Sequence, residues 1–243
     1  MSDQNARSML TRGRCGNLLI DALPTKERRS VIAQCSTVEL ARNRVLSVAD
    51  KADRYVYFPI SGSIAVTQEV DGNEPLELSS IGAEGMLGAT LVLGINRALQ
   101  GGVVQLPCSA MRMPSRSLRS LLEECPGLRR GLQRYLYFIL SDLSQTAACV
   151  RYHGVRPRLV RALLMVHDCA ARDDLPLLTH SMLAKMLGVQ RGSVTLAAAD
   201  LQRAGYIRYQ RGKISILDRP RLETEACDCY GIRLKNYRRS LAP

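Results

Sequence analysis

The chain has 243 residues, of which 46% are hydrophobic, enough to bury one large core or two moderate ones. Its formal net charge of +12 is uneven: residues 1–115 hold 12 Lys or Arg and 11 Asp or Glu, whereas residues 116–243 hold 22 and 11. No apolar run reaches the length of a membrane span, and the N-terminal residues lack the apolar segment of a signal peptide. We therefore expect a cytoplasmic protein with no membrane partner and reduced cysteines, whose basic second half binds a polyanion.

The first half of the chain changes from a helical to a strand-like pattern. Residues 16–35 have apolar residues at helical spacing, and Pro24 is suited to begin a second helix. From about residue 37 to 114, short alternating runs are separated by Gly, Asp and Asn, with a typical hairpin turn at Asp71-Gly72-Asn73. Many short strands at this spacing predict a β-barrel or jelly roll.

Helical spacing returns at residue 115. Residues 115–124 predict a short helix, and Pro126 begins a long helix that extends to about Gly154. Its apolar stripe consists of Leu128, Leu132, Leu136, Ile139, Leu143 and Ala147, widened by Tyr135, Phe138 and Leu140. A helix apolar on more than one side needs a partner beyond its own domain, which a coiled-coil-like contact with a second copy would supply. Burial within one subunit is the alternative, and we favour the homodimer.

A helix over residues 155–172 and a loop over 172–176 precede the most informative stretch, residues 178–207, which predict a helix-turn-helix. Thr179 is a good N-cap for the first helix, and Leu183 and Leu187 form its apolar face. Gly188 suits the left-handed turn between the two helices. A final amphipathic basic helix, or a pair of turns, is predicted over residues 219–239.

Polar side chains on the second helix predict contact with duplex DNA. The group consists of Gln190, Arg191, Ser193 and Thr195. Arg191 matches the two acceptors on the major-groove edge of guanine. Thr179 and His180, at the start of the first helix, belong to the same predicted DNA-binding set, and we expect His180 to point to a phosphate or to solvent. Two β runs after Ile207 flank an Arg-Gly turn, which places Arg211 and Lys213 on a basic hairpin beside the phosphates. An ordinary helical hairpin is the alternative, but the basic hairpin and the charge asymmetry favour DNA binding.

This order of elements resembles the Crp–Fnr family of bacterial transcription regulators. The strongest motifs are Leu187-Gly188-Val189 and RGKISILD, while the segments YVYFPISG, GAEGMLGA and CDCYG look like one large subgroup of the family. The resemblance implies an α+β fold in three parts. These are N-terminal helices with a sensory, cyclic-nucleotide-binding-like β-barrel (1–114), a short helix with a long dimerisation helix (115–154), and a winged helix-turn-helix with a basic C-terminal helix (155–243).

The same resemblance implies a homodimer that reads a palindromic DNA site, with RNA polymerase as a candidate partner and no enzymatic activity. The usual recognition helix of the family begins Arg-Glu-Thr-Val and carries a second Arg later. Here the sequence is Arg191-Gly192-Ser193-Val194, with Leu196 at the later position. Because a carboxylate acceptor and an Arg donor are missing, we expect an operator that differs from the family's usual one.

The resemblance also identifies a candidate ligand site in the barrel. Cyclic-AMP members of the family carry Gly-Glu for the ribose and Arg-Ser or Arg-Ala for the cyclic phosphate. At the matching positions this chain has Gly88-Ala89 and Arg97-Ala98, so the ribose carboxylate is missing. A phosphate site needs several converging donors. We therefore do not expect a cyclic nucleotide, and the small-molecule effector is unidentified.

The cysteines do not predict a cofactor. Cys15 and Cys35 are too far apart for the iron–sulfur cluster of oxygen-sensing relatives, so no cluster is expected. Cys227-Asp228-Cys229 is a weak metal signal, which we interpret as packing of the final segment. Cys149 and His153 stand at i, i+4 and could share a metal across a dimer axis, but we expect no metal site.

Two other functions remain open from the sequence. One is an allosteric module that binds a cyclic nucleotide or another small ligand without sequence-specific DNA recognition. The other is an enzyme, although no nucleophile–base grouping or phosphate loop is evident and the chain has only three His. The DNA-binding regulator is the hypothesis that we favour.

Overall fold

The computed structural model describes residues 15–71, 75–170, 174–175, 178–210 and 212–241. Two short helices, α2 (Leu18–Asp21) and α3 (Thr25–Ala33), come first. Asn17 caps α2 and is fully buried, and its Nδ2 donates to the carbonyl oxygens of Pro59 and Gly85, both at 2.9 Å. These bonds fix the first helix on the sheet that follows.

The sheet is antiparallel throughout and runs in the order β1-β5-β3-β4, with β2 also paired to β5. Its strands are β1 (Ser36–Leu40), β2 (Val45–Ser47), β3 (Tyr55–Gln68), β4 (Leu76–Ile81) and β5 (Gly101–Pro114). The long strands β3 and β5 carry register shifts at three places, and such shifts bend a sheet. The 3₁₀ helix η1 (Ala89–Leu93) lies between β4 and β5. The turn expected at Asp71-Gly72-Asn73 falls partly outside the described residues.

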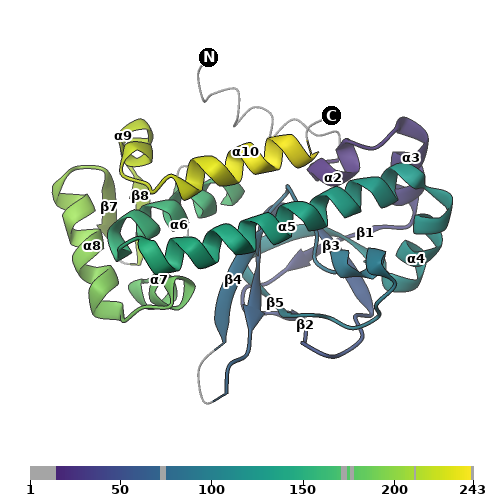
Figure 1. The fold of residues 1–243 in the computed structure, drawn as a ribbon, viewed down its shortest axis with the longest axis horizontal. Coiled ribbons are helices and arrows are strands. Elements are labelled where there is room, and N and C mark those ends of the chain that lie inside the picture. The colour runs from purple at the N-terminus through teal and green to yellow at the C-terminus, as the bar shows by residue number, and fades with distance from the viewer. Residues whose placement is uncertain (1–14, 72–74, 171–173, 176–177, 211, 242–243) are drawn as a thin grey trace.

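The long helix crosses the sheet domain. Helix α4 (Ser115–Glu124) leads into α5 (Pro126–Tyr152), close to the bounds that the sequence predicts. One face of α5 packs on the bent sheet, which is called the barrel below. The contact is made through the buried side chains of Leu128, Leu132, Tyr135 and Phe138. Figure 1 shows α5 extending from the barrel to the C-terminal domain, so the helix connects the two ends of the molecule.

The C-terminal domain is a winged helix. Helices α6 (Val155–Ala170), α7 (His180–Leu187) and α8 (Arg191–Arg203) share one core with the strands β7 (Ile207–Gln210) and β8 (Lys213–Ile216). Part of the expected loop over 172–176 is instead a short strand, β6 (Asp174–Leu175), which pairs with β8 because the wing offers it a free edge. The rest of that loop lies outside the described residues.

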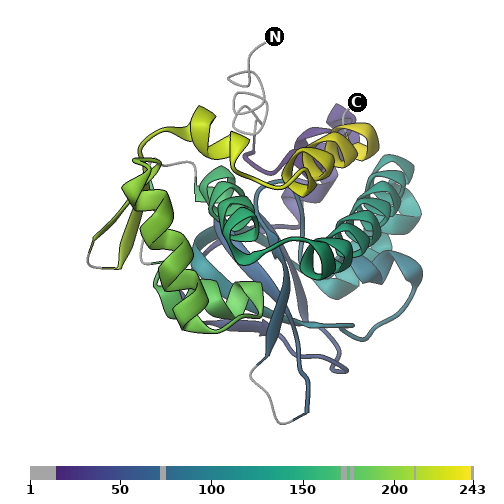
Figure 2. The ribbon, with the colours of Figure 1, turned by 60° about the vertical axis from the view of Figure 1, so that its left-hand side comes forward.

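The C-terminal segment forms two helices, α9 (Arg219–Thr224) and α10 (Cys229–Leu241). Helix α10 leaves the winged helix and runs back along α5 toward α2, as both views of the ribbon show (Figures 1 and 2). Tyr237 of α10 packs edge-on against Phe138, with ring centroids 5.4 Å apart. The predicted α+β architecture of a barrel, a long helix and a winged helix-turn-helix is confirmed. Among the described helices, none is both long enough and apolar enough to cross a membrane.

Candidate nucleic-acid interface

Helices α7 and α8 each pack into the core of the winged helix through a buried apolar face. Leu183, Val194 and Leu201 are fully buried, so the opposite face of α8 is turned outward. Gly188 ends α7 in the left-handed conformation (φ 61°), where a side chain would be strained. Thr179 caps α7, its Oγ1 accepting from the backbone N–H of Met182 at 3.3 Å. The cap and the turn therefore have the form that the sequence predicts.

The outward face of α8 carries the predicted base-reading group. Gln190 and Arg191 are exposed at the N-terminal end of α8, and the side chain of Gln190 does not cap the helix. Ser193 is half-buried in the first turn. The N-terminal end of a recognition helix is the part that contacts base edges in helix-turn-helix complexes. Leu196, 71% exposed, gives this face an apolar position where the family usually has Arg.

His180 has a different environment from the one expected. Its ring stacks on Tyr209 of the wing, with centroids 4.2 Å apart, and its Nδ1 lies 3.0 Å from Oγ1 of Thr195. Burial, followed by the nearby charge of Arg191, lowers the pKa of His180 below its usual value. The expectation that His180 points to a phosphate or solvent is therefore wrong, because an aromatic ring of the wing covers it. A neutral His180 joins α7, α8 and the wing.

Thr195 takes part in the same contact. Its Oγ1 donates to the carbonyl oxygen of Arg191 at 3.0 Å, which fits a His180 ring that is protonated on Nδ1. Thr195 is nevertheless exposed on the outer face of α8. Its hydroxyl thus has two partners within the protein before any base is present.

The wing carries positive charge on one face. Strands β7 and β8 pair Arg208 with Ser215 and Gln210 with Lys213, so these side chains point to the same side of the hairpin. Arg208, Gln210 and Lys213 are all exposed. Arg211 lies outside the described residues. Arg208 was not among the DNA-binding residues predicted from the sequence, although strand alternation from the buried Ile207 places it on the same side of the hairpin as Lys213.

A cavity of about 440 Å³ lies between the barrel and α5. Gly88, Ala89 and Ala98 from the predicted ligand site line it, whereas Arg97 is exposed and does not. Among the described residues around this cavity, Arg233 of α10 is the one Lys or Arg. Its guanidinium already faces Asp142 at 3.3 Å and Glu84 at 3.4 Å. The cavity therefore presents few donors for a phosphate.

The cysteines are arranged differently from the expectation. Burial raises the pKa of Cys15 to about 11 and that of Cys35 to about 12, so neither is a reactive thiolate. Cys149 and His153 do not need a second subunit to complete a group, because Cys227 and Cys229 of the same chain lie beside them. The sequence alone could not bring these residues together, because Cys149 and His153 lie at the end of α5 whereas Cys227 and Cys229 lie at the start of α10, far away in the chain.

Comparison with known proteins agrees with this geometry. Residues 157–225 match the Crp-like helix-turn-helix domain. Over 200 residues the chain is 24% identical to the CRP-like cAMP-activated global transcriptional regulator of Mycobacterium tuberculosis, covering 79% of this chain and 89% of that protein.

Solved structures share the fold over most of the chain. FixK2 from Bradyrhizobium japonicum is similar with a TM-score of 0.68 and 14% identity, covering 79% of this chain and 98% of that one. The c-di-GMP responsive global regulator CLP from Xanthomonas campestris is similar with a TM-score of 0.64 and 16% identity, covering 80% and 100%. The matched helix-turn-helix and the regulator homologue support a DNA-binding transcription regulator of the Crp–Fnr type, and the solved structures support its fold.

Proposed function

We propose that the protein binds a palindromic duplex site as a homodimer and places α8 of each subunit in the major groove. The observation that carries this proposal is the outward face at the start of α8. Gln190 and Arg191 are exposed there, above a fully buried Val194. Arg208 and Lys213 on the wing supply charge for the phosphates that flank the groove.

An exposed stripe on α5 supports the homodimer. Tyr137 and Leu140 are both 65% exposed, and Ser144, Ala147 and Arg151 continue the same face at three- and four-residue spacing. The opposite faces of α5 are covered by the barrel and α10. A second copy packed on this stripe would pair two winged helices for two half-sites.

The cavity between the barrel and α5 is the proposed effector site, and its walls come from the part of the chain assigned to sensing (1–114), from α5 and from Arg233 of α10. Tyr137 and Leu140 of the exposed stripe also line it, so a second copy seated on that stripe would lie beside the bound effector. Its one cation is paired with two carboxylates, which favours a mostly apolar small molecule over a cyclic nucleotide. Burial also raises the pKa of Asp53 in the cavity wall.

The proposal is tested by selecting bound duplexes from a random pool with the full chain, with and without cell extract. We expect an inverted repeat whose half-sites are centred about 10 base pairs apart. Extract dependence would show that a ligand is needed, and cyclic AMP alone should not replace the extract. Recovery of no shared sequence under either condition would overturn sequence-specific recognition and leave the ligand-binding module as the better account.

A further inference from the structure

Four metal-ligating side chains meet where the long helix ends. Cys149 lies in the last turn of α5, and His153 is its C-cap. Cys227 precedes α10, and Cys229 is the first residue of that helix. The Sγ atoms of the three cysteines and a ring nitrogen of His153 all lie within 4.8 Å of one another. No base-reading residue and no lining residue named for the effector cavity belongs to this group.

The spacing fits one tetrahedral ion. Sγ of Cys149 is 3.6 Å from Sγ of Cys227, and Sγ of Cys229 is 3.4 Å from Nδ1 of His153. Metal–ligand bonds of about 2.3 Å to sulfur and about 2.0 Å to nitrogen give tetrahedral edges of about 3.8 and about 3.5 Å. Three thiolates and one imidazole form a common structural zinc set, which leaves no coordination position open. These two edges therefore lie within a few tenths of an ångström of those of a closed site, and none of the other four exceeds 4.8 Å.

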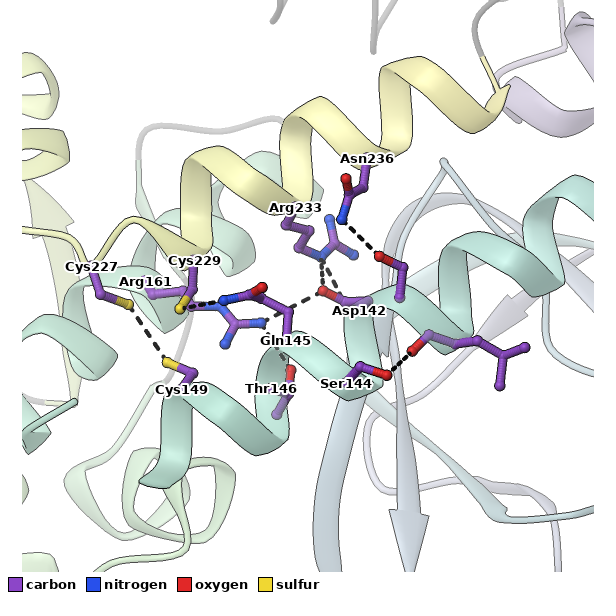
Figure 3. Close-up of polar contacts among 12 residues, drawn as sticks. Asp142, Ser144, Gln145, Thr146, Cys149, Arg161, Cys227, Cys229, Arg233 and Asn236 are labelled. Carbon is purple, nitrogen blue, oxygen red and sulfur yellow. Dashed lines mark hydrogen bonds and ion pairs between the residues drawn. The ribbon is translucent and has the colours of Figure 1, made fainter. Parts of the chain in front are cut away.

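The surroundings suit bound thiolates. Cys149 and Cys229 are 1% exposed and Cys227 is 8% exposed, so water has little access. Gln145 donates from Nε2 to Sγ of Cys229 at 3.1 Å, as Figure 3 shows, and Cys229 also receives the favourable end of the α10 dipole. Such outer contacts orient metal ligands.

A buried cation lies beside the group. Three thiolates around a divalent ion leave one negative charge, and the guanidinium of Arg161, 7% exposed, lies next to them (Figure 3), while it also pairs with Asp142 at 3.6 Å. The thiolate is the form of cysteine that a divalent ion binds, and a guanidinium beside the group favours that form.

We propose that Cys149, His153, Cys227 and Cys229 bind a single zinc-class divalent ion in a tetrahedral site. The ion ties the start of α10 to the link between α5, which ends at Tyr152, and α6, which begins at Val155. It thereby fixes the direction in which the winged helix leaves the long helix. This proposal does not depend on the identity of the operator or of the effector.

The test uses the full-length chain, purified under reducing conditions from cells grown with added zinc. Elemental analysis should find about one zinc per chain. After removal of the metal with a chelator, titration with Co²⁺ should give the visible bands and sulfur-to-metal charge transfer of tetrahedral cobalt. Cys229→Ser and His153→Ala should each weaken Co²⁺ binding by about 100-fold or more.

Two further variants keep the test decisive if a ligand variant misfolds. Cys229→His retains four ligands and should still bind Co²⁺, with weaker charge transfer because one sulfur is gone. Cys35→Ser, a cysteine outside the group, should bind like the parent. The proposal is overturned if the reduced protein contains less than about one tenth of a metal ion per chain and shows no cobalt bands. It is also overturned if Cys35→Ser weakens Co²⁺ binding as much as the ligand variants do. It is also overturned if the chain in intact cells carries a Cys149–Cys227 disulfide instead of the ion.

Discussion

The reading face of α8 and the cavity beside α5 are built in opposite ways. The reading face comes from neighbouring residues in one helix and begins with the exposed side chains of Gln190 and Arg191. The cavity is assembled from the barrel, α5 and α10, and its one cation is neutralised by Asp142 and Glu84. The difference teaches that the predicted DNA-reading group is set by local sequence, whereas the proposed effector site depends on long-range packing.

The largest effect should come from separating the two reading faces. Leu140→Glu places a charge in the exposed stripe of α5, and loss of the dimer removes the advantage of binding two half-sites together. We expect affinity for a palindromic duplex to fall by about 10²- to 10⁴-fold. Sedimentation of the same protein reports in parallel whether it is still a dimer. Val45→Glu, an equally exposed apolar position on β2, should leave both measurements unchanged. A Leu140→Glu protein that stays dimeric would show that the stripe is not the interface.

The orientation of α8 can be tested with two leucines on its opposite faces. Leu201 is fully buried, so Leu201→Ala should lower the free energy of unfolding by about 2–5 kcal/mol in urea titrations. Leu196 is 71% exposed on the outward face, and Leu196→Ala should change it by less than about 0.5 kcal/mol. Equal effects would contradict the orientation of α8.

We expect the positive charge of the wing to contribute to DNA affinity without selecting a sequence. Lys213→Ala is expected to weaken binding to all duplexes by a similar small factor and to reduce the log–log salt slope by about one. Lys51→Ala, which removes an exposed charge from the barrel, is the matched control. A change in the preferred sequence in Lys213→Ala would mean that the wing reads bases.

The smallest effect concerns pH. Because the pKa of His180 in the folded protein is lower than its usual 6.5, the unfolded chain binds the proton more readily. The stability from neutral His180 is therefore complete above about pH 6.5 and decreases as the pH falls below that value. Urea midpoints at pH 7.5 and 5.5 should differ less in His180→Asn than in the parent. An unchanged difference would assign the pH dependence to other groups.

The sequence predicts those parts of the molecule in which the interacting residues are close in the chain. The cap at Thr179, the turn at Gly188 and the limits of α4 and α5 follow from local preferences and apolar spacing. The stacking of His180 on Tyr209 does not, because it depends on how the wing folds back over α7. The same limit explains why the sequence predicted a phosphate or solvent as the neighbour of His180.

The packing of α10 on α5 was also beyond local reasoning. The sequence shows an amphipathic basic helix but not which surface receives it, and it does not show that the largely covered side chain of Arg233, 11% exposed, meets Asp142 and Glu84. Cys149 and Cys227 meet across 78 residues for the same reason. The effector cavity and the cysteine group therefore became visible only in three dimensions.

The most direct measurement is the affinity of Arg191→Ala for the selected operator, compared with Arg203→Ala at the other end of the same helix. Arg203 is exposed and paired with Asp200, so it matches the charge removed but lies away from the N-terminal end. We predict that Arg191→Ala costs about 1–3 kcal/mol and relaxes one base position in each half-site, while Arg203→Ala keeps the parent's sequence preference. Equal affinity and unchanged sequence preference in Arg191→Ala would contradict the assignment of α8 as the recognition helix.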